Sequence, residues 1–273
     1  MAIFSFRKVT PHLSFFGFLI LTSVFGTPVL AQSAGPTTEN RVSTEMFRIP
    51  VGTILPARLN HGFSSKSARP GQAVTARIMQ EVPLPNQESI PEGAKLLGKI
   101  VSVERAGNGA MGKITFRFDT LESHHRVIPI VASLRALAGF MEVQSAQTPA
   151  FTPGFGTPYL WANTRQIGGD EVYGVGGPVT NQSSEWVGKG VYGGVLVHIR
   201  AQPESRCRGP LDSEDRLQAL WVFSSDACGV YGIPGVKIAH AGRTEPVGEI
   251  TLLADQEELL VRGASGMLLR VVR

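Results

Sequence analysis

The residues of this chain that could do nucleophilic or acid–base chemistry are scattered, and no spacing among them names a reaction. Ser224, Ser225 and Asp226 are adjacent and His240 follows them, so a Ser/His/Asp trio can be assembled on paper. A triad is defined by geometry, however, and the chain has no G-x-S-x-G turn to present a serine nucleophile. A hydrolase is therefore the minor alternative, and we expect no enzyme and no catalytic residue.

Candidate metal ligands and phosphate-binding glycines also fail to form a site. His124 and His125 are adjacent, and adjacent strand residues point to opposite faces, so they do not converge on one ion. The run GNGAMG (Gly107 to Gly112) spells G-x-G-x-x-G, but dinucleotide binding needs a helix after it. The alternating run KITFRFDTL (Lys113 to Leu121) follows instead, which predicts a hairpin. The acidic run Asp212 to Asp215 favours a solvated loop, with weak calcium binding as the alternative. We expect no metal and no cofactor.

Residues 1–31 have the features of a secretory signal peptide. Arg7 and Lys8 form a short positive region, an apolar run of about thirteen residues extends from Leu13 to Phe25, and Val29-Leu30-Ala31 offers small side chains for cleavage. As a helix the apolar run spans only ~20 Å, short of the ~30 Å hydrocarbon core of a bilayer. We therefore expect cleavage after Ala31 rather than an uncleaved anchor, and no transmembrane helix afterwards. The expected location is the periplasm, the outer envelope or the cell exterior.

Charge and cysteine content narrow the class of partner. Cleavage lowers the formal charge from +4 to about +2, because the signal holds two basic residues and no acidic one. The remaining basic residues form no stripe with aromatics, so a nucleic-acid partner is not expected. In an oxidising compartment Cys207 and Cys228 are expected to form a disulfide. The alternative, a reactive thiol or metal pair, lacks a C-x-x-C motif or a histidine at ligand spacing.

Candidate ligand contacts lie between Phe140 and Lys189, a stretch rich in Gly, Pro, Gln, Thr and Ser. It contains Trp161, Tyr173 and Trp186, which we take as the candidate ligand-contact residues. Aromatic rings in a polar, Gly-rich setting can stack on sugar rings, but they can equally fix a loop to the body of the protein. Because long loops are uncommon in compact domains, this irregular insertion is predicted to be functional, to be partly disordered, or to contain small elements that the sequence pattern does not resolve.

The elements that must position these residues are predicted to be strands. The chain has 31 glycines and 18 prolines, which is typical of many short strands joined by turns. Two similar phrases, IPVGTILPARL (Ile49 to Leu59) and IPEGAKLLGKI (Ile90 to Ile100), each begin with Ile-Pro and a glycine suited to positive φ. Each phrase is predicted to form a turn that starts a strand.

The strands between and after these phrases should have one buried face. In Gln72 to Val82 the core-facing set is predicted to be Val74, Ala76, Ile78, Gln80 and Val82. On Lys113 to Leu121 the inward set is Ile114, Phe116 and Phe118, whereas Lys113, Thr115, Arg117 and Asp119 should face water. The terminal run MLLRVV is predicted to add a buried strand to the same barrel.

The segment from Ile49 to Leu121 resembles the C-terminal β domain of the TrbI/VirB family of conjugation and type IV secretion core-channel proteins. Four phrases carry the likeness in the same order: IPVGTILPARL, PGQAVTARIMQEV from Pro70, IPEGAKLLGKI, and KITFRFDTL. A weaker likeness is to small β-clip domains with the same opening. The resemblance implies a β-barrel in an envelope setting, and it covers about a third of the mature chain. Residues 140–243 have no counterpart in it.

The sequence thus predicts an all-β fold: a small antiparallel barrel or sandwich with a long Gly/Pro-rich insertion and a disulfide-closed C-terminal region. The predicted divisions are a signal peptide (1–31), a disordered leader (32–44), the barrel core (45–139), the irregular insertion (140–189) and a β-rich C-terminal region completing the barrel (190–273). The expected function is a non-enzymatic structural or assembly role in the envelope, with envelope proteins or further copies of the chain as partners. The alternative is a ligand- or glycan-binding module that uses the Trp/Tyr-bearing insertion.

Overall fold

In the computed structural model the two Ile-Pro-x-Gly phrases form the same turn and open two strands that flank a third. In each turn the residue after glycine donates its N–H to the proline carbonyl, at 3.2 Å in the first and 3.3 Å in the second. Gly52 and Gly93 have φ of 91° and 85°, the conformation that glycine adopts without steric cost. Strand β1 (Ile54–Leu59) follows the first turn and β6 (Lys95–Glu104) the second, and both pair with β3 (Ala73–Ile78). The predicted turns and strands are confirmed.

The structure describes residues 48–107, 110–123, 126–150, 162–199, 207, 216–255 and 258–273. The predicted signal peptide and leader, the His124-His125 pair, Trp161 and the acidic run Asp212 to Asp215 therefore lie outside the described residues. Residues Met46–Arg273 form one unit, so the barrel core, the insertion and the C-terminal region predicted from the sequence fold together.

A large sheet of ten strands forms the main body. Its order is β16-β9-β20-β1-β3-β6-β7-β18-β17, with β8 paired to β7. Within this sheet all described strand pairings are antiparallel except that of β16 with β9. The strands not yet introduced are β7 (Lys113–Ser123), β8 (Arg126–Pro129), β9 (Ala132–Ala138), β16 (Gly229–Tyr231), β17 (Val236–Ala241), β18 (Ile250–Ala254) and β20 (Gly266–Val271).

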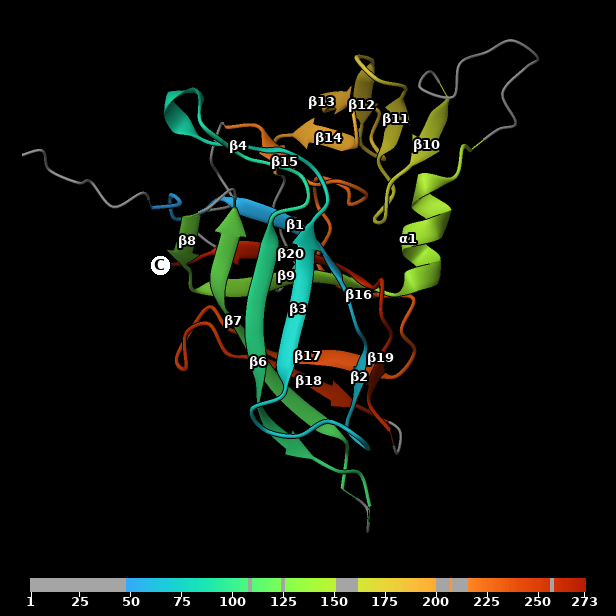
Figure 1. Ribbon diagram of the computed structural model, residues 1–273. Coiled ribbons are helices and arrows are strands. Elements are labelled where there is room, and N and C mark those ends of the chain that lie inside the picture. Colours follow the sequence, from blue (N-terminus) through green and yellow to red (C-terminus); the bar gives the residue numbers. More distant parts are fainter. Residues whose placement is uncertain are drawn as a thin grey trace, which may run out of the picture. The chain divides into compact units, whose positions relative to one another are not determined.

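The large sheet curls around the main hydrophobic core without closing. In Figure 1 strands β3, β6 and β7 cross in front of β9, β20 and β1, and side chains from both sets belong to one buried cluster. Strand β20, the predicted closing strand, pairs with β1 on one side and β9 on the other. Among the described residues the two ends of the sheet, β16 and β17, do not pair with each other. The all-β fold is confirmed, whereas a closed barrel is not found.

The predicted core faces are buried, and one residue predicted to face water is buried as well. All five residues of the inward set on the β3 segment are buried, as are Ile114, Phe116 and Phe118 on β7. The rings of Phe116 and Phe118 meet edge to face at 6.0 Å. Thr115, predicted to face water, is also buried, because β18 pairs with β7 at this position and the hydroxyl of Thr251 lies 2.9 Å from that of Thr115. Period-2 alternation indicates the two faces of a strand but not which neighbour covers them.

A second, smaller sheet lies above the large one in Figure 1. Its six strands follow the order β10 (Asn163–Arg165), β11 (Glu171–Tyr173), β12 (Pro178–Thr180), β13 (Trp186–Val191), β14 (Gly194–Val197) and β15 (Gln218–Ala219). Helix α1 (Phe140–Gln147) leads into it. The remaining elements are the pairs β2 (Phe63–Ser64) with β19 (Leu260–Val261) and β4 (Val82–Pro83) with β5 (Ser89–Ile90), and the short helix η1 (Pro85–Gln87).

The small sheet differs from the sequence-based prediction in two ways. The region predicted as an irregular insertion, 140–189, contains helix α1 and strands β10 to β12 with most of β13. The strand predicted over Val191 to Arg200 is interrupted by a turn at Tyr192-Gly193 that joins β13 to β14. Strands β10, β11, β12 and β14 have only three or four residues, too few for alternation to stand out among glycines.

A buried glutamine joins the small sheet to the main body. Gln80, which follows β3, is 1% exposed. Its side-chain amide donates to the Val195 carbonyl at 2.8 Å, and its oxygen accepts the N–H groups of Val195 at 3.3 Å and Trp221 at 2.7 Å. Gln80, predicted to point inward, thus contacts two backbone groups of Val195 on β14 and one of Trp221, which follows β15. No helix in the described part of the chain is long and apolar enough to cross a membrane.

Candidate binding face and its surroundings

The small sheet has one buried face and one open face. Val172 on β11, Val179 on β12 and Val187 on β13 are buried in a second hydrophobic cluster that includes residues of α1. Side chains alternate between the two faces of a strand, so the neighbours of these valines point outward. We call the outward side chains of β10 to β13 the platform.

Strand register fixes how the platform residues lie. Arg165 pairs with Glu171, Glu171 with Thr180, and Thr180 with Trp186, which gives one row across four strands. Tyr173 is two residues from Glu171 on the same face of β11. With strands about 4.8 Å apart and two residues spanning about 6.8 Å, Tyr173 and Trp186 are separated by roughly 12 Å. Two aromatic side chains therefore stand at opposite corners of a polar patch.

Polar contacts hold the edge of this patch in place. The Arg165 guanidinium donates to Glu171 at 2.7 Å, and the Tyr173 hydroxyl donates to the other carboxylate oxygen of Glu171 at 3.2 Å. The hydrogen bond from Arg165, followed by that from Tyr173, lowers the pKa of Glu171. The carboxylate is thus kept charged, and it positions the tyrosine ring through its hydroxyl.

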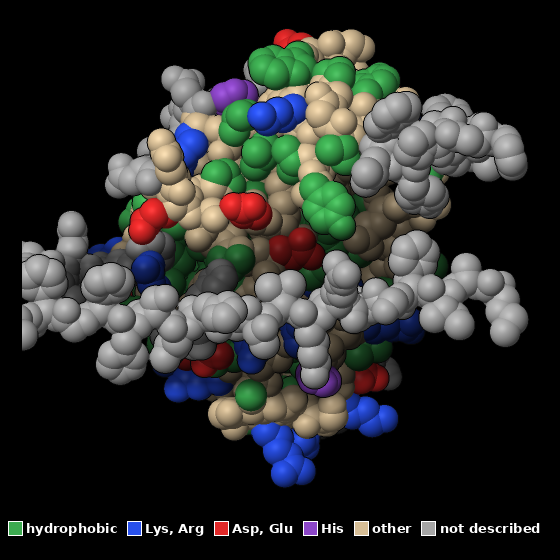
Figure 2. Space-filling model, turned by 45° about the horizontal axis from the view of Figure 1, so that its top comes forward, with side chains coloured by type: hydrophobic (Ala, Val, Ile, Leu, Met, Phe, Trp, Pro, Cys, Tyr) green, Lys and Arg blue, Asp and Glu red, His purple; other side chains and the backbone are tan. Residues whose placement is uncertain are grey.

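Two exposed aromatic side chains lie on the platform. Trp186 is 62% exposed and Tyr173 is 42% exposed, and Val175 on the turn after β11 is also exposed. In Figure 2 hydrophobic side chains lie in the open over the upper part of the molecule, among polar ones. Tryptophan is a highly buried residue type on average, so an open indole on a sheet face is informative.

The structure places two of the three predicted ligand-contact residues on one surface. Tyr173 and Trp186 share the platform, whereas Trp161 lies outside the described residues. Sequence reasoning did not single out Arg165 and Glu171, which organise the tyrosine. Their only local signal is opposite charge on either side of the Gly168-Gly169 pair, a pattern typical of a short hairpin.

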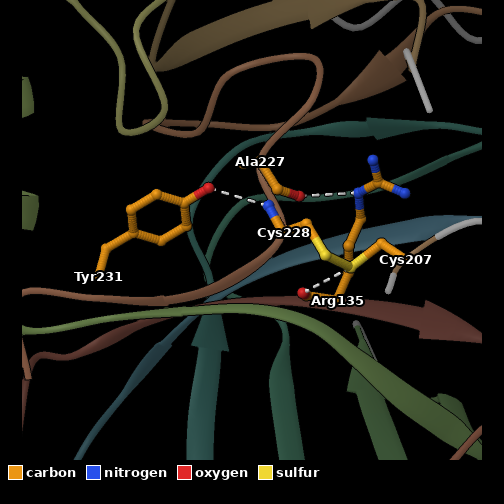
Figure 3. The surroundings of a disulfide bond; sticks show 5 residues. All are labelled: Arg135, Cys207, Ala227, Cys228 and Tyr231. Atoms are coloured by element: carbon orange, nitrogen blue, oxygen red, sulfur yellow. Dashed lines mark hydrogen bonds between the residues drawn. A yellow bond between two sulfur atoms is a disulfide. The ribbon is translucent and has the colours of Figure 1, made fainter. Parts of the chain in front are cut away.

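The predicted disulfide is present. Cys207 and Cys228 are joined, with their Cα atoms 5.9 Å apart. Figure 3 shows the bond beside Arg135, whose Nε donates to the Ala227 carbonyl at 3.0 Å. The Tyr231 hydroxyl accepts the Cys228 N–H at 3.0 Å. The Cys207 sulfur also touches the Arg135 carbonyl oxygen at 3.3 Å, a contact and not a hydrogen bond because an oxidised cysteine has no S–H. The disulfide is consistent with an oxidising, extracytoplasmic location.

The Ser/His/Asp trio considered from the sequence has other contacts. The Ser224 hydroxyl donates to Asp226 at 2.7 Å. The His240 ring instead contacts the loop that follows it: Nδ1 accepts the Gly242 N–H at 3.0 Å and Nε2 lies 3.1 Å from the Glu245 carbonyl. The contacts described for His240 thus fix its own loop and involve neither serine nor Asp226.

One buried carboxylate lies near these serines. Asp170 is 1% exposed and accepts the Ser225 N–H at 2.7 Å. Burial raises the pKa of Asp170, partly offset by the hydrogen bonds from Ser225, and the nearby charge of Asp226 adds to the rise. This group anchors the turn before β11 and is a source of pH dependence.

Within the described ranges no three His, Cys, Asp or Glu side chains gather in a way that could hold a metal ion. Comparison of the chain with protein-family models, with curated proteins and with solved structures found no match.

Proposed function

We propose that this protein is an exported, non-enzymatic module of the cell envelope that binds a glycan on the platform of its small sheet. The observation that carries the proposal is the position of Trp186. Its ring is exposed on the outward face of a sheet whose inward face is packed, in the same row as the hydrogen-bonding side chains of Thr180 and Glu171.

The chemistry of the platform suits a chain of sugar rings. Pyranose rings have apolar faces that pack on aromatic rings and hydroxyl edges that need donors and acceptors. Tyr173 and Trp186, roughly 12 Å apart, are too distant to stack on one ring. The polar groups between them can bond the hydroxyls of the intervening part. We therefore infer an oligosaccharide or polysaccharide ligand rather than a monosaccharide.

A glycan array probed with the exported protein tests the proposal. Trp186→Ala should weaken binding to the bound glycans by about 1–2 kcal/mol, a factor of roughly 5–30, since one stacked ring is lost. Tyr173→Ala should act in the same direction. Thr180→Ala, which keeps both rings, should have a smaller effect.

Tyr192→Ala is the matched control. Tyr192 is 76% exposed, but it follows the far end of β13 from Trp186, roughly 20 Å away along the strand. Binding should survive its loss. An array without any bound glycan, or equal binding by the wild type and the Trp186→Ala variant, would remove the proposal.

A structural or assembly role in the envelope is the second candidate. It is motivated by the resemblance of Ile49 to Leu121 to the TrbI/VirB β domain and by one observation: both Ile-Pro-x-Gly turns open strands that flank β3. Under this proposal the protein assembles with envelope proteins or with its own copies in the periplasm or outer envelope. Chemical cross-linking in cells and size measurement of the purified protein test it, and a strictly monomeric species without an envelope partner would count against it.

A further inference from the structure

A cavity of about 880 Å³ lies where the large sheet stops short of closing. Its walls come from β9, β16, β17 and β20, the loop after β17 and the disulfide, so we call it the seam cavity. The volume falls within the roughly 300–1,000 Å³ of small-molecule sites. The cavity is remote in sequence from the platform, and the proposed glycan site does not use it.

One side of the seam cavity is apolar and continuous with the main core. Leu134 and Val236 belong to the buried cluster of the large sheet, and Val230 and Ile238 pack against that cluster. An apolar group that enters the seam cavity would therefore leave water and pack against the edge of the core. This burial is favourable in proportion to the apolar area covered.

The other side is basic. All the ionisable side chains among the described lining residues are cations or histidine: Arg135, Lys237, His240, Arg243 and Arg270. Arg135 and Arg270 are only 4% and 5% exposed. A smaller void is lined by these two arginines together with Arg243 and Cys207, so three guanidinium groups gather at the disulfide end.

A guanidinium group that already has one partner can bind a second acceptor. Arg135, Arg243 and Arg270 already interact with other parts of the protein, and Nε of Arg135 donates to Ala227. A guanidinium has five N–H donors, however, and pairs with a carboxylate through two at once. The other two basic side chains have partners elsewhere. Lys237 forms a 2.7 Å ion pair with Asp255, and the His240 ring contacts the loop that follows it.

We propose that the seam cavity binds an amphipathic anion, a fatty carboxylate with its chain against Leu134 and Val230 and its head group on the arginines. The proposal follows from the pairing of an apolar wall with a cluster of guanidinium groups in one cavity. Neither wall alone selects such a ligand: the apolar wall favours any chain, and the basic wall favours any anion.

Titration calorimetry with sodium decanoate, at low ionic strength and below its micelle concentration, tests the proposal on the oxidised protein. Acetate supplies the head group without the chain, and decanol supplies the chain without the charge. Decanoate should bind at least tenfold more tightly than either, and added salt should weaken it because charge-assisted contacts are screened.

Two variants address the two walls. Ala239 lines the cavity at the irregularity of β17 between Ile238 and His240, and it is exposed. Ala239→Trp should fill the cavity and abolish binding. Arg243 is exposed on the loop after β17, so Arg243→Gln should fold normally and weaken binding by roughly tenfold through loss of one charged contact.

Arg262→Gln is the matched control, because it removes an exposed arginine outside the cavity and should leave binding unchanged. Three results would overturn the proposal: no decanoate binding by the wild type, equal affinity of the wild type and the Arg243→Gln variant, or acetate binding as tightly as decanoate. If Ala239→Trp lowers the melting temperature, Arg243→Gln alone decides. Glycan binding is measured separately, so failure here leaves the platform proposal untouched.

Discussion

Replacement of Gln80 by leucine should weaken the attachment of the small sheet to the main body and so lower the stability of the protein. Leucine has a similar volume, so the packing around position 80 changes little. The change removes the only side chain that donates to Val195 and accepts from Val195 and Trp221 in the described contacts. The perturbation therefore isolates the hydrogen bonds of one buried amide.

The loss can be estimated group by group. The Val195 carbonyl keeps a second partner, the Leu220 N–H at 3.2 Å. The N–H groups of Trp221 and Val195 lose the acceptor that Gln80 provides, at 2.7 Å and 3.3 Å. A buried donor without a partner costs about 1–3 kcal/mol, and the longer bond lies at the lower end. We expect Gln80→Leu to lower the free energy of unfolding by about 2–4 kcal/mol.

Urea unfolding followed by tryptophan fluorescence measures this loss, since Trp221 is buried beside Gln80. Gln144→Leu is the control, because Gln144 is exposed on α1 and its loss should change stability by less than about 0.5 kcal/mol. If Gln80→Leu costs no more than the control, the side chain does not hold the two sheets together. A reduced slope of the unfolding curve would instead indicate that the small sheet opens separately.

Three further perturbations have directions fixed by the structure. Replacing Cys207 and Cys228 by serine should lower the free energy of unfolding by about 3 kcal/mol, because the bond closes a loop between residues 21 apart; coincident urea curves would contradict this. Asp170→Asn should remove a pH dependence: burial raises the pKa of Asp170, so the folded state holds its proton more tightly than the unfolded chain. Stability of the wild type relative to this variant should then increase as pH falls from neutrality through the raised folded-state pKa toward the ordinary value of 3.8. A pH-independent difference in melting temperature would refute the assignment. Gly98→Ala should cost at least about 2 kcal/mol, because a Cβ there would overlap the Arg117 carbonyl on β7, and an unchanged melting temperature would show that the strands are not so close.

Local features of the fold were predictable because they depend on residues near one another in the chain. Glycine at the fourth position of each Ile-Pro-x-Gly phrase predicts the positive φ of Gly52 and Gly93. Alternation predicts the buried faces of β3 and β7. The absence of any other cysteine leaves one pairing for Cys207 and Cys228, given an oxidising compartment.

The candidate site was only partly predictable. Composition drew attention to Tyr173 and Trp186, but their common face depends on the register through β12, where one irregularity shifts the pairing after Val179. A shift of one residue would have turned Trp186 to the buried side. Nothing in the local sequence specifies that shift.

By itself the sequence determined an all-β chain with two glycine turns, strands of known inward faces and one available disulfide. Only the tertiary structure decided that the large sheet stays open at β16 and β17, that Gln80 spans two sheets, and that Tyr173 and Trp186 stand on one surface. The physical reason is separation: Gln80 and Val195 lie 115 residues apart, and contacts of that kind depend on how strands pair across the whole chain. Local conformational preferences decide the elements, whereas burial and hydrogen bonding between distant strands decide the sites.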